Sequence, residues 1–445
     1  METTEKEKRE QKEFFWNLGL QTIKELETDE GILASSRDEL FGAIFGRDSS
    51  ITAIKLLKVY KIKSDLYFLR LVRKILLGLA RLQGKSVNIE SGEEPGKCIH
   101  EYRPTNHERL SKLSVRPWYI YPDGKLRNYD SVDSTPLFLI ACYRYFQLSK
   151  DYKFLSEVLP SIELGLEWLL DCGARGKSGV IKCIERDEDS DIFVDYEMPP
   201  QRKHGGLTTQ SWMDSEASVF HEDGREVARP INPIEVQAYT FLAYRLWANY
   251  FKEVNPDKGS LLNERANRLK EQFNNQFITK KDSKVIIPFA IDGRGEPLVS
   301  ARSTMGHCFW ASLNPADDQI KETIFSEENL PLVLERIFRS DLFEPKAGVR
   351  TLSTESRRFS ANSYHNGSIW PHDTGIIAEG LQDLGLIEDS QRLKEALLQA
   401  FWHFKTPLEL FVFDKNYKEY EEGSGATSKQ AWSAATMLWL SADSV

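Results

Sequence analysis

The sequence of 445 residues has few cysteines, no long apolar run and no excess of positive charge. Its five cysteines, at positions 98, 142, 172, 183 and 308, are an odd number and have no CxxC spacing, which predicts reduced thiols in a cytosol-like compartment. No apolar run approaches the ~18 residues that a membrane-spanning helix needs. The net charge of −9 argues against nucleic acid or an anionic membrane as the main partner, because phosphate recognition needs a basic surface. These absences favour a cytoplasmic protein with a neutral ligand.

Motifs for phosphate, metal and export are also missing. No glycine-rich loop of the Walker or Rossmann type is present. His365 and His372 do not fit HExxH or any other close metal-ligand spacing. The charged segment at residues 1–9 is not followed by the apolar stretch of a signal peptide. We therefore expect no cofactor, no metal site and no export.

What the sequence does contain predicts a large helical domain. With 41% hydrophobic residues and ten tryptophans the chain is globular and can bury a large core. No Pro- or Ser-rich linker and no internal repeat divides it, so we predict one domain over residues 1–445, with the helix of residues 1–30 packed on it.

Apolar residues at helical spacing predict about twelve helices. They are expected near residues 8–26, 46–59, 66–82, 129–148, 154–170, 232–250, 260–277, 306–312, 327–338, 370–384, 390–402 and 428–440, with Ser428 capping the last. Strand signals are few: residues 180–194 are compatible with a hairpin and 285–291 with a strand. Short turns alternate with long loops, which predicts an all-α fold of helix hairpins arranged in a ring, with the long loops gathered at one end to form the site.

One loop, residues 210–215, places a carboxylate between a tryptophan and a hydroxyl without helical or strand periodicity. The apolar wall of Trp212 would keep the carboxyl of Asp214 protonated near neutral pH, as the proton donor of a sugar hydrolase requires. The alternative is structural: Asp214 would cap a helical turn that leads into Glu216.

Polar residues beside aromatic residues recur in the long loops, a mixture that suits sugars, whose C–H faces pack on rings while their hydroxyls form hydrogen bonds. The residues concerned are Arg47, Asp48, His100, Glu101, Asp130, Asp133, Trp212, Asp214, Glu235, Gln237, His365, Asn366, Trp370, His372, Asp373, Glu409 and Trp432. Structural alternatives stay open, since Arg47 and Asp48 could be a solvated pair at a helix start. Asp133 could be a helix cap and Glu235 a first-turn acid.

Several of these stretches together resemble one family. The stretches Phe45–Ser49, Tyr129–Pro136, Trp212–Ser215, Pro233–Tyr239, Tyr364–Asp373, Leu408–Phe411 and Gln430–Ser433 occur in this order in the glucosidase part of glycogen-debranching enzymes. Gly96–Glu101 is similar too. The chain thus resembles the amylo-alpha-1,6-glucosidase family from about Leu40 to the C-terminus. The resemblance implies an (α/α)6 barrel, related in fold to glucoamylase, that hydrolyses α-linked glucose with inversion.

By position, the resemblance implies that Asp214 is the general acid and Glu409 the general base, while Arg47 and Asp48 hold the hydroxyls of the non-reducing sugar. The further residues expected to bind substrate are Glu101, Asp133, Trp212, Gln237, His365, Asn366, Trp370, His372 and Trp432. The family's Leu-Pro-Glu-Leu reads Pro-Leu-Glu-Leu around Glu409 here. Glu421 is therefore kept as the alternative base.

The full-length debranching enzymes carry additional domains ahead of this one, so we expect a small α-glucoside to be cleaved faster than glycogen limit dextrin. Two other functions stay open. A sugar phosphorylase on the same fold would need a cationic pocket, which the sequence does not provide beyond Arg47 and Arg103. A non-catalytic oligosaccharide-binding protein would not need both Asp214 and Glu409. Linkage, aglycone and oligomeric state are left open.

Overall fold

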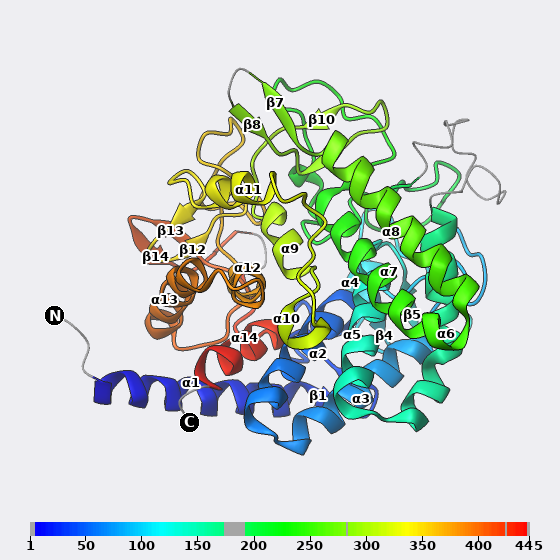
Figure 1. Cartoon of the computed structure of the whole chain (residues 1–445), viewed down its shortest axis with the longest axis horizontal. Helices are drawn as coiled ribbons and strands as arrows, with labels where there is room; N and C mark the ends of the chain where they lie inside the picture. Colours follow the sequence, from blue (N-terminus) through cyan, green and yellow to red (C-terminus); the bar gives the residue numbers. More distant parts are fainter. Residues whose placement is uncertain (1–4, 173–191, 282–283, 423–424, 443–445) are drawn as a thin grey trace.

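Twelve of the helices form two concentric rings, an (α/α)6 barrel (Figure 1). The computed structural model describes residues 5–172, 192–281, 284–422 and 425–442. The inner ring contains α2 (Gly46–Lys63), α5 (Ser134–Ser149), α7 (Ile234–Val254), α9 (Thr304–Trp310), α12 (Pro371–Asp383) and α14 (Ala431–Ser441). Each inner helix contacts the next, and α14 contacts α2, so the ring closes.

The outer ring covers the inner one. It consists of α1 (Glu5–Leu26), α3 (Leu66–Leu82), α6 (Tyr152–Cys172), α8 (Pro256–Gln276), α11 (Leu330–Ile337) and α13 (Ile387–Phe404). Figure 1 shows α1, in dark blue, beside the last helix α14, in red, and the two helices are in contact. Among the described residues, none of the helices combines the length and the apolar character that crossing a bilayer requires.

The two rings differ in how the sequence distributes its apolar residues. Outer helix α3 buries one stripe, which includes Phe68, Leu71, Ile75 and Leu79, and leaves the opposite face to solvent, as helical amphipathicity predicts. Inner helix α12 is buried at every position from Pro371 to Leu381, because it has neighbours on all sides. The polar residues of such helices must find partners inside the protein.

Short strands and two short helices organise the loops. The three-stranded sheets are β3 (Ile44–Phe45), β4 (Glu101–Arg103) and β5 (Leu126–Asn128), and β6 (Asn232–Pro233), β9 (Ala290–Ile291) and β10 (Pro297–Leu298). The hairpins are β1 (Glu27–Thr28) with β2 (Gly31–Ile32), β7 (Thr279–Lys281) with β8 (Lys284–Ile286), β11 (Phe343–Glu344) with β12 (Gly348–Val349), and β13 (Val412–Asp414) with β14 (Asn416–Lys418). The short helices in the loops are α4 (Glu108–Ser111) and α10 (Pro315–Asp318).

Strands β3 and β6 lead directly into inner helices α2 and α7, so the sheets hold the N-terminal ends of these helices. The first residue of α2 is Gly46, where a Cβ atom would stand 2.0 Å from the carbonyl oxygen of Ile99. Only glycine permits this close approach of the two chains. The start of α2 is thereby fixed against the loop that precedes β4.

The predicted all-α ring of helix hairpins is confirmed, while several boundaries were wrong. Ser428 does not cap the last helix: α14 starts at Ala431, and the backbone N–H and the hydroxyl of Ser428 both donate to Glu39. The strand predicted at 285–291 is two strands, β8 and β9, in different sheets. The hairpin predicted at 180–194 falls almost entirely outside the described residues.

Candidate active site

A cavity enclosing about 370 Å³ of empty space, its mouth included, lies where the inner helices α2, α12 and α14 begin. The loops that precede these three helices and the loop before α7 form its wall. The residues that line it are Phe41, Phe45, Arg47, Asp48, Trp212, Asp214, Tyr364, His365, Trp370, Glu409, Gln430 and Trp432. Three carboxyl groups, those of Asp48, Asp214 and Glu409, therefore share one aromatic pocket.

Asp214 lies on a loop that is held by hydrogen bonds to a neighbouring segment and within the loop itself. The carbonyl oxygen of Gln210 accepts a hydrogen bond from the backbone N–H of Val132 at 2.8 Å, and the hydroxyl of Ser218 donates to the carbonyl oxygen of Met213. The side chain of Asp214 is 26% exposed, and its Oδ2 accepts a hydrogen bond from Arg47 at 2.8 Å. It does not cap the short 3-10 helix Glu216–Ser218.

The pKa of Asp214 is raised to about 6, because burial disfavours the carboxylate more than the Arg47 guanidinium favours it. Trp212, which is buried, contributes to the apolar surroundings of the loop. A carboxyl with such a pKa is partly protonated near neutral pH and can serve as a proton donor.

Arg47 connects two carboxylates that are far apart in the sequence. It donates from Nη1 to Asp133 at 2.9 Å and from Nη2 to Asp214 at 2.8 Å. Asp133 also accepts a hydrogen bond from the hydroxyl of Ser131. It occupies the N-cap position of α5, as the structural interpretation predicted, but its side chain makes no capping hydrogen bond to that helix. Asp133 holds Arg47, and Arg47 in turn orients Asp214.

Asp48 belongs to the first turn of α2 and is buried at the cavity wall. The N-cap position of α2 is Phe45, so Asp48 is not the cap of this helix. Its carboxyl lies 4.0 Å from Nε of Arg47. Burial raises its pKa to about 7, although the Arg47 guanidinium acts in the opposite direction.

Glu409 is held on both oxygens. Tyr364 donates its hydroxyl proton to Oε1, while the backbone N–H and the hydroxyl of Thr427 donate to Oε2 at 2.8 and 3.1 Å. Burial raises the pKa of Glu409 to about 7, and these donors oppose that rise. The three hydrogen bonds also restrict the direction in which the carboxyl can point.

The alternative carboxyl lies elsewhere. Glu421 is exposed, as are Glu419 and Glu422, and none of them lines the cavity. Of the C-terminal glutamates that the sequence suggested, Glu409 is the one that lies in the cavity wall.

Aromatic rings form the apolar part of the wall. The ring of Trp370 lies 5.3 Å from that of Trp212 in an edge-on arrangement and 5.2 Å from the stacked imidazole of His365. Tyr364 and Trp432 extend the wall, with ring centres 4.9 and 6.3 Å from that of Trp370. Such faces accept the C–H groups of a sugar ring.

Five of the residues that were predicted to bind substrate do not line the cavity. Glu101 pairs with Arg103 in β4, and Gln237 bonds to both backbone groups of Val194. Asn366 bonds to Arg302 and to the carbonyl oxygen of Ala217. The remaining two are Asp133, which holds Arg47, and His372, which stacks on Trp432 at 3.7 Å.

Conversely, the cavity contains Phe41, Phe45, Tyr364 and Gln430, which the sequence did not single out. Three of them, Phe45, Tyr364 and Gln430, belong to the family-like stretches, and this membership was the signal that could have identified them. Gln430 donates to the hydroxyl of Thr427, which itself donates to Glu409. Gln430 is thus linked to the candidate base through one side chain.

Four lining residues carry a buried polar atom that has no hydrogen-bond partner. These atoms are Nε of Arg47, Nε1 of Trp212, Oε1 of Gln430 and Nε1 of Trp432. Buried polar groups are nearly always hydrogen-bonded in folded proteins, so a group of orphans around one cavity calls for a polar ligand or ordered water there.

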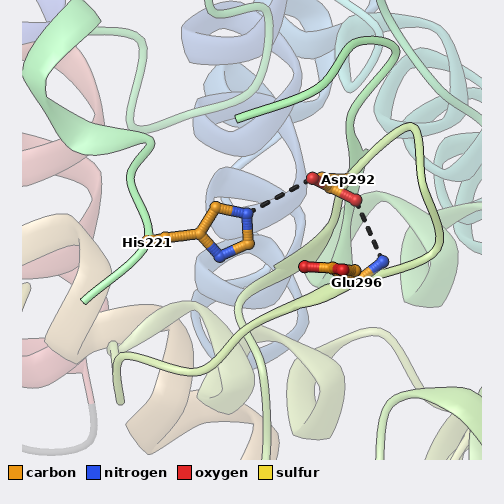
Figure 2. A group of neighbouring side chains, drawn as sticks. All are labelled: His221, Asp292 and Glu296. Carbon is orange, nitrogen blue, oxygen red and sulfur yellow. Dashed lines mark hydrogen bonds and ion pairs between the residues drawn. The ribbon is translucent and has the colours of Figure 1, made fainter. Parts of the chain in front are cut away.

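A second cluster, outside this cavity, has the composition of a metal site. Figure 2 shows His221, Asp292 and Glu296, whose ligand atoms lie within 4.8 Å of one another. Oδ1 of Asp292 accepts the backbone N–H groups of Arg294 and Glu296 at 2.9 Å, and Oδ2 accepts from His221 at 3.3 Å. The carboxylate is thus engaged in closing the turn between β9 and β10, and its hydrogen bonds lower its pKa.

Comparison with known families and structures gives matches over most of the chain. A family model described as amylo-alpha-1,6-glucosidase matches residues 117–439. No curated protein matches the chain with significance.

Solved structures resemble it over nearly its whole length. A GH63 mannosylglycerate hydrolase from Thermus thermophilus in complex with glucose has a TM-score of 0.62 at 13% identity, and the match covers 96% of this chain and 99% of that one. A structure named Glycosidase Wild Type has a TM-score of 0.59 at 11% identity, with coverages of 100% and 99%. At these identities the likeness concerns the fold.

Proposed function

Because the chain belongs to the amylo-alpha-1,6-glucosidase family, we propose that it is an inverting glycoside hydrolase that removes glucose from an α-glucoside. The observation that carries this proposal is the group of orphaned polar atoms around the cavity. Nε of Arg47 and the two indole N–H groups are free donors, and Oε1 of Gln430 is a free acceptor. Together with the carboxyl of Asp48 they complement sugar hydroxyls, which both donate and accept.

The first chemical step is proton transfer to the glycosidic oxygen. Asp214, in its neutral form, gives its proton to that oxygen as the bond between the oxygen and C1 breaks. Its raised pKa makes the neutral form accessible, and Arg47 stabilises the carboxylate that remains afterwards. The departing alcohol thereby leaves without a negative charge.

The second group acts on water. Glu409, as a carboxylate, accepts a proton from a water molecule that attacks C1 from the opposite face of the ring. Tyr364 and Thr427 hold the two oxygens of Glu409 and favour its ionised form. We expect the carboxyl groups of Asp214 and Glu409 to stand roughly 6.5–9.5 Å apart, because the water must fit between the base and the sugar.

The first test is the anomeric configuration of the product together with the choice of substrate. Proton NMR of the first-formed sugar should show β-glucose, and an α product would exclude inversion. The substrates should include α-1,6-, α-1,4- and α,α-1,1-linked glucosides, α-glucosides of small polyols and acids, and glycogen limit dextrin. We expect a small α-glucoside to have a higher kcat/KM than limit dextrin, in keeping with the similar fold of a mannosylglycerate hydrolase. Limit dextrin as the better substrate would identify a debranching module.

The same assay distinguishes a phosphorylase. Arg47 is the only arginine or lysine among the described residues that line the cavity, and it is already paired with Asp133 and Asp214. A phosphate ion would also face three carboxyl groups, so turnover should not depend on phosphate. Release of glucose 1-phosphate would contradict this expectation.

Asp48→Ala should lower kcat/KM far more than it lowers stability. The carboxyl of Asp48 is proposed to bind a hydroxyl of the sugar, and one such charge-assisted hydrogen bond contributes roughly 1.5–3 kcal/mol, or about 10- to 150-fold in rate. Steady-state kinetics and thermal unfolding should be measured on the same preparations, with Glu421→Ala as the exposed control. Unchanged kinetics with a lower Tm would mean that Asp48 has a purely structural role.

We also propose a cytoplasmic location, because Cys98, Cys142 and Cys308 are free and buried thiols.

A further inference from the structure

A buried arginine behind the Asp214 loop has no ionic partner at contact distance. Arg302, two residues before the start of α9, is 1% exposed. Its Nη1 donates to the carbonyl oxygen of His365 and its Nη2 to that of Ser218 and to Oδ1 of Asn366, each at 2.7 Å. None of the described carboxylates forms an ion pair with it. Its positive charge therefore lies inside the protein without a paired counter-ion, an arrangement that is costly.

Two aromatic rings compensate part of this charge. The guanidinium lies 5.3 Å from the ring centre of Phe220 and 4.7 Å from that of Phe289. Its Nε–H nevertheless has no hydrogen-bond partner. Burial lowers the pKa of Arg302 to about 9, with Glu222 and, after it, Glu235 acting in the opposite direction, and the group stays charged at neutral pH.

Arg302 lines a small cavity on the far side of the Asp214 loop. The lining residues are Tyr196, Ser211, Met213, Ser218, Val219, Ile231, Pro233, Glu235, Phe289, Ala290, Arg302 and Thr304. About 10 Å³ is open to the centre of a water-sized sphere, so the cavity accommodates one water molecule or a monoatomic ion of similar size. The hydroxyl of Thr304 is a second buried group without a partner in this wall.

Glu235 is the acidic residue of the cavity wall, and its carboxyl is protonated at neutral pH. Burial raises its pKa to about 8, and the nearby carboxylate of Asp133 acts in the same direction. The neutral form of Glu235 is thereby favoured at pH 7. Glu235 also makes no ion pair with Arg302, although both line this cavity, so the charge of Arg302 is not balanced within the cavity wall.

We propose that this cavity binds one halide ion, with Nε of Arg302 and the hydroxyl of Thr304 as its donors. A halide supplies the missing counter-charge and accepts both unpartnered hydrogens, whereas a water molecule would satisfy the donors and leave the charge uncompensated. A polyatomic anion such as phosphate or a carboxylate does not fit a space of one water molecule.

A bound halide would also affect Asp214, the proposed acid. Binding of the halide does not depend on the proposed function, but this effect on Asp214 rests on it. Ser211, Met213 and Ser218 form one wall of the cavity and flank Asp214 in the same loop. A halide there strengthens the attachment of the loop to Arg302. Its negative charge behind Asp214 favours the protonated carboxyl that the proposed acid needs. Chloride should therefore increase kcat as well as stability.

Bromide provides a direct test, because it scatters anomalously. Crystals of the full chain soaked in sodium bromide should show an anomalous peak in the cavity beside Arg302. The Tm should be higher in sodium chloride than in sodium gluconate at equal ionic strength, with a saturable dependence on chloride. Neither readout requires activity, so failure of the proposed function and failure of the halide site can be told apart.

Two neighbouring hydroxyls provide a matched pair of variants. Thr304→Val removes a donor from the cavity and should weaken chloride binding by about tenfold or more, as expected for a lost hydrogen bond to a charged group. Ser303→Ala removes another buried, unpartnered hydroxyl that does not line the cavity, and should leave chloride binding unchanged. Absence of the bromide peak together with equal Tm values in chloride and gluconate would show that the site holds water, and would overturn the proposal.

Discussion

Glu409→Gln should abolish hydrolysis of every α-glucoside, whatever its leaving group. The proposed role of Glu409 is to take a proton from the attacking water, and this step is required even when the leaving group needs no proton. General base catalysis contributes about 10²- to 10⁴-fold, so kcat should fall by at least about 10²-fold both for a natural glucoside and for α-glucosyl fluoride.

The matched control is Glu421→Gln, which changes an exposed glutamate nearby and should leave kcat unchanged. The amide introduced by Glu409→Gln has one oxygen, which can accept from Tyr364 or from Thr427 but cannot serve both, so a moderately lower Tm is also expected. Circular dichroism and binding of a glucose analogue would show that the variant is folded. An active Glu409→Gln together with an inactive Glu421→Gln would move the base to Glu421.

Asp214→Asn should show a different pattern, because its effect depends on the leaving group. Glucosides of poorly acidic alcohols should lose about 10²- to 10⁴-fold in kcat, while α-glucosyl fluoride, whose leaving group needs no proton, should retain most of its rate. Binding should be largely preserved, since the amide is isosteric with the carboxyl. Equal losses for both substrates would contradict the assignment of Asp214 as the acid.

The pH dependence provides a second measurement on the same variant. The wild-type kcat/KM should be bell-shaped, because Asp214 must be protonated and Glu409 ionised, and with pKa values of about 6 and about 7 the maximum should lie between pH 6 and 7. In Asp214→Asn with α-glucosyl fluoride only Glu409 must ionise. The rate should then rise through pH 7 and reach a plateau. If the rate of this variant still declined at alkaline pH, a group other than Asp214 would cause that decline.

The sequence determined the fold class and the segments that surround the cavity. The apolar stripe of α3 follows from the spacing of its apolar residues, because helical periodicity decides which face must avoid water. The continuous burial of α12, which includes His372, Asp373 and Glu379, follows instead from its neighbours in the barrel. The family-like stretches at Arg47, Trp370 and Trp432 lie at the starts of α2, α12 and α14. The closed ring brings these starts together, so the motifs meet although they are far apart in the sequence.

The tertiary structure alone decided which side chain of each stretch reaches the cavity. His365 lines it, whereas its neighbour Asn366 turns to Arg302, and the loop that holds both has no periodicity that would separate them. Likewise, Arg47 meets partners 86 and 167 residues away, and Glu409, not Glu421, lies in the wall. The raised pKa values of Asp214 and Glu409 follow from the same cause, since desolvation and charge partners depend on long-range packing and not on local sequence.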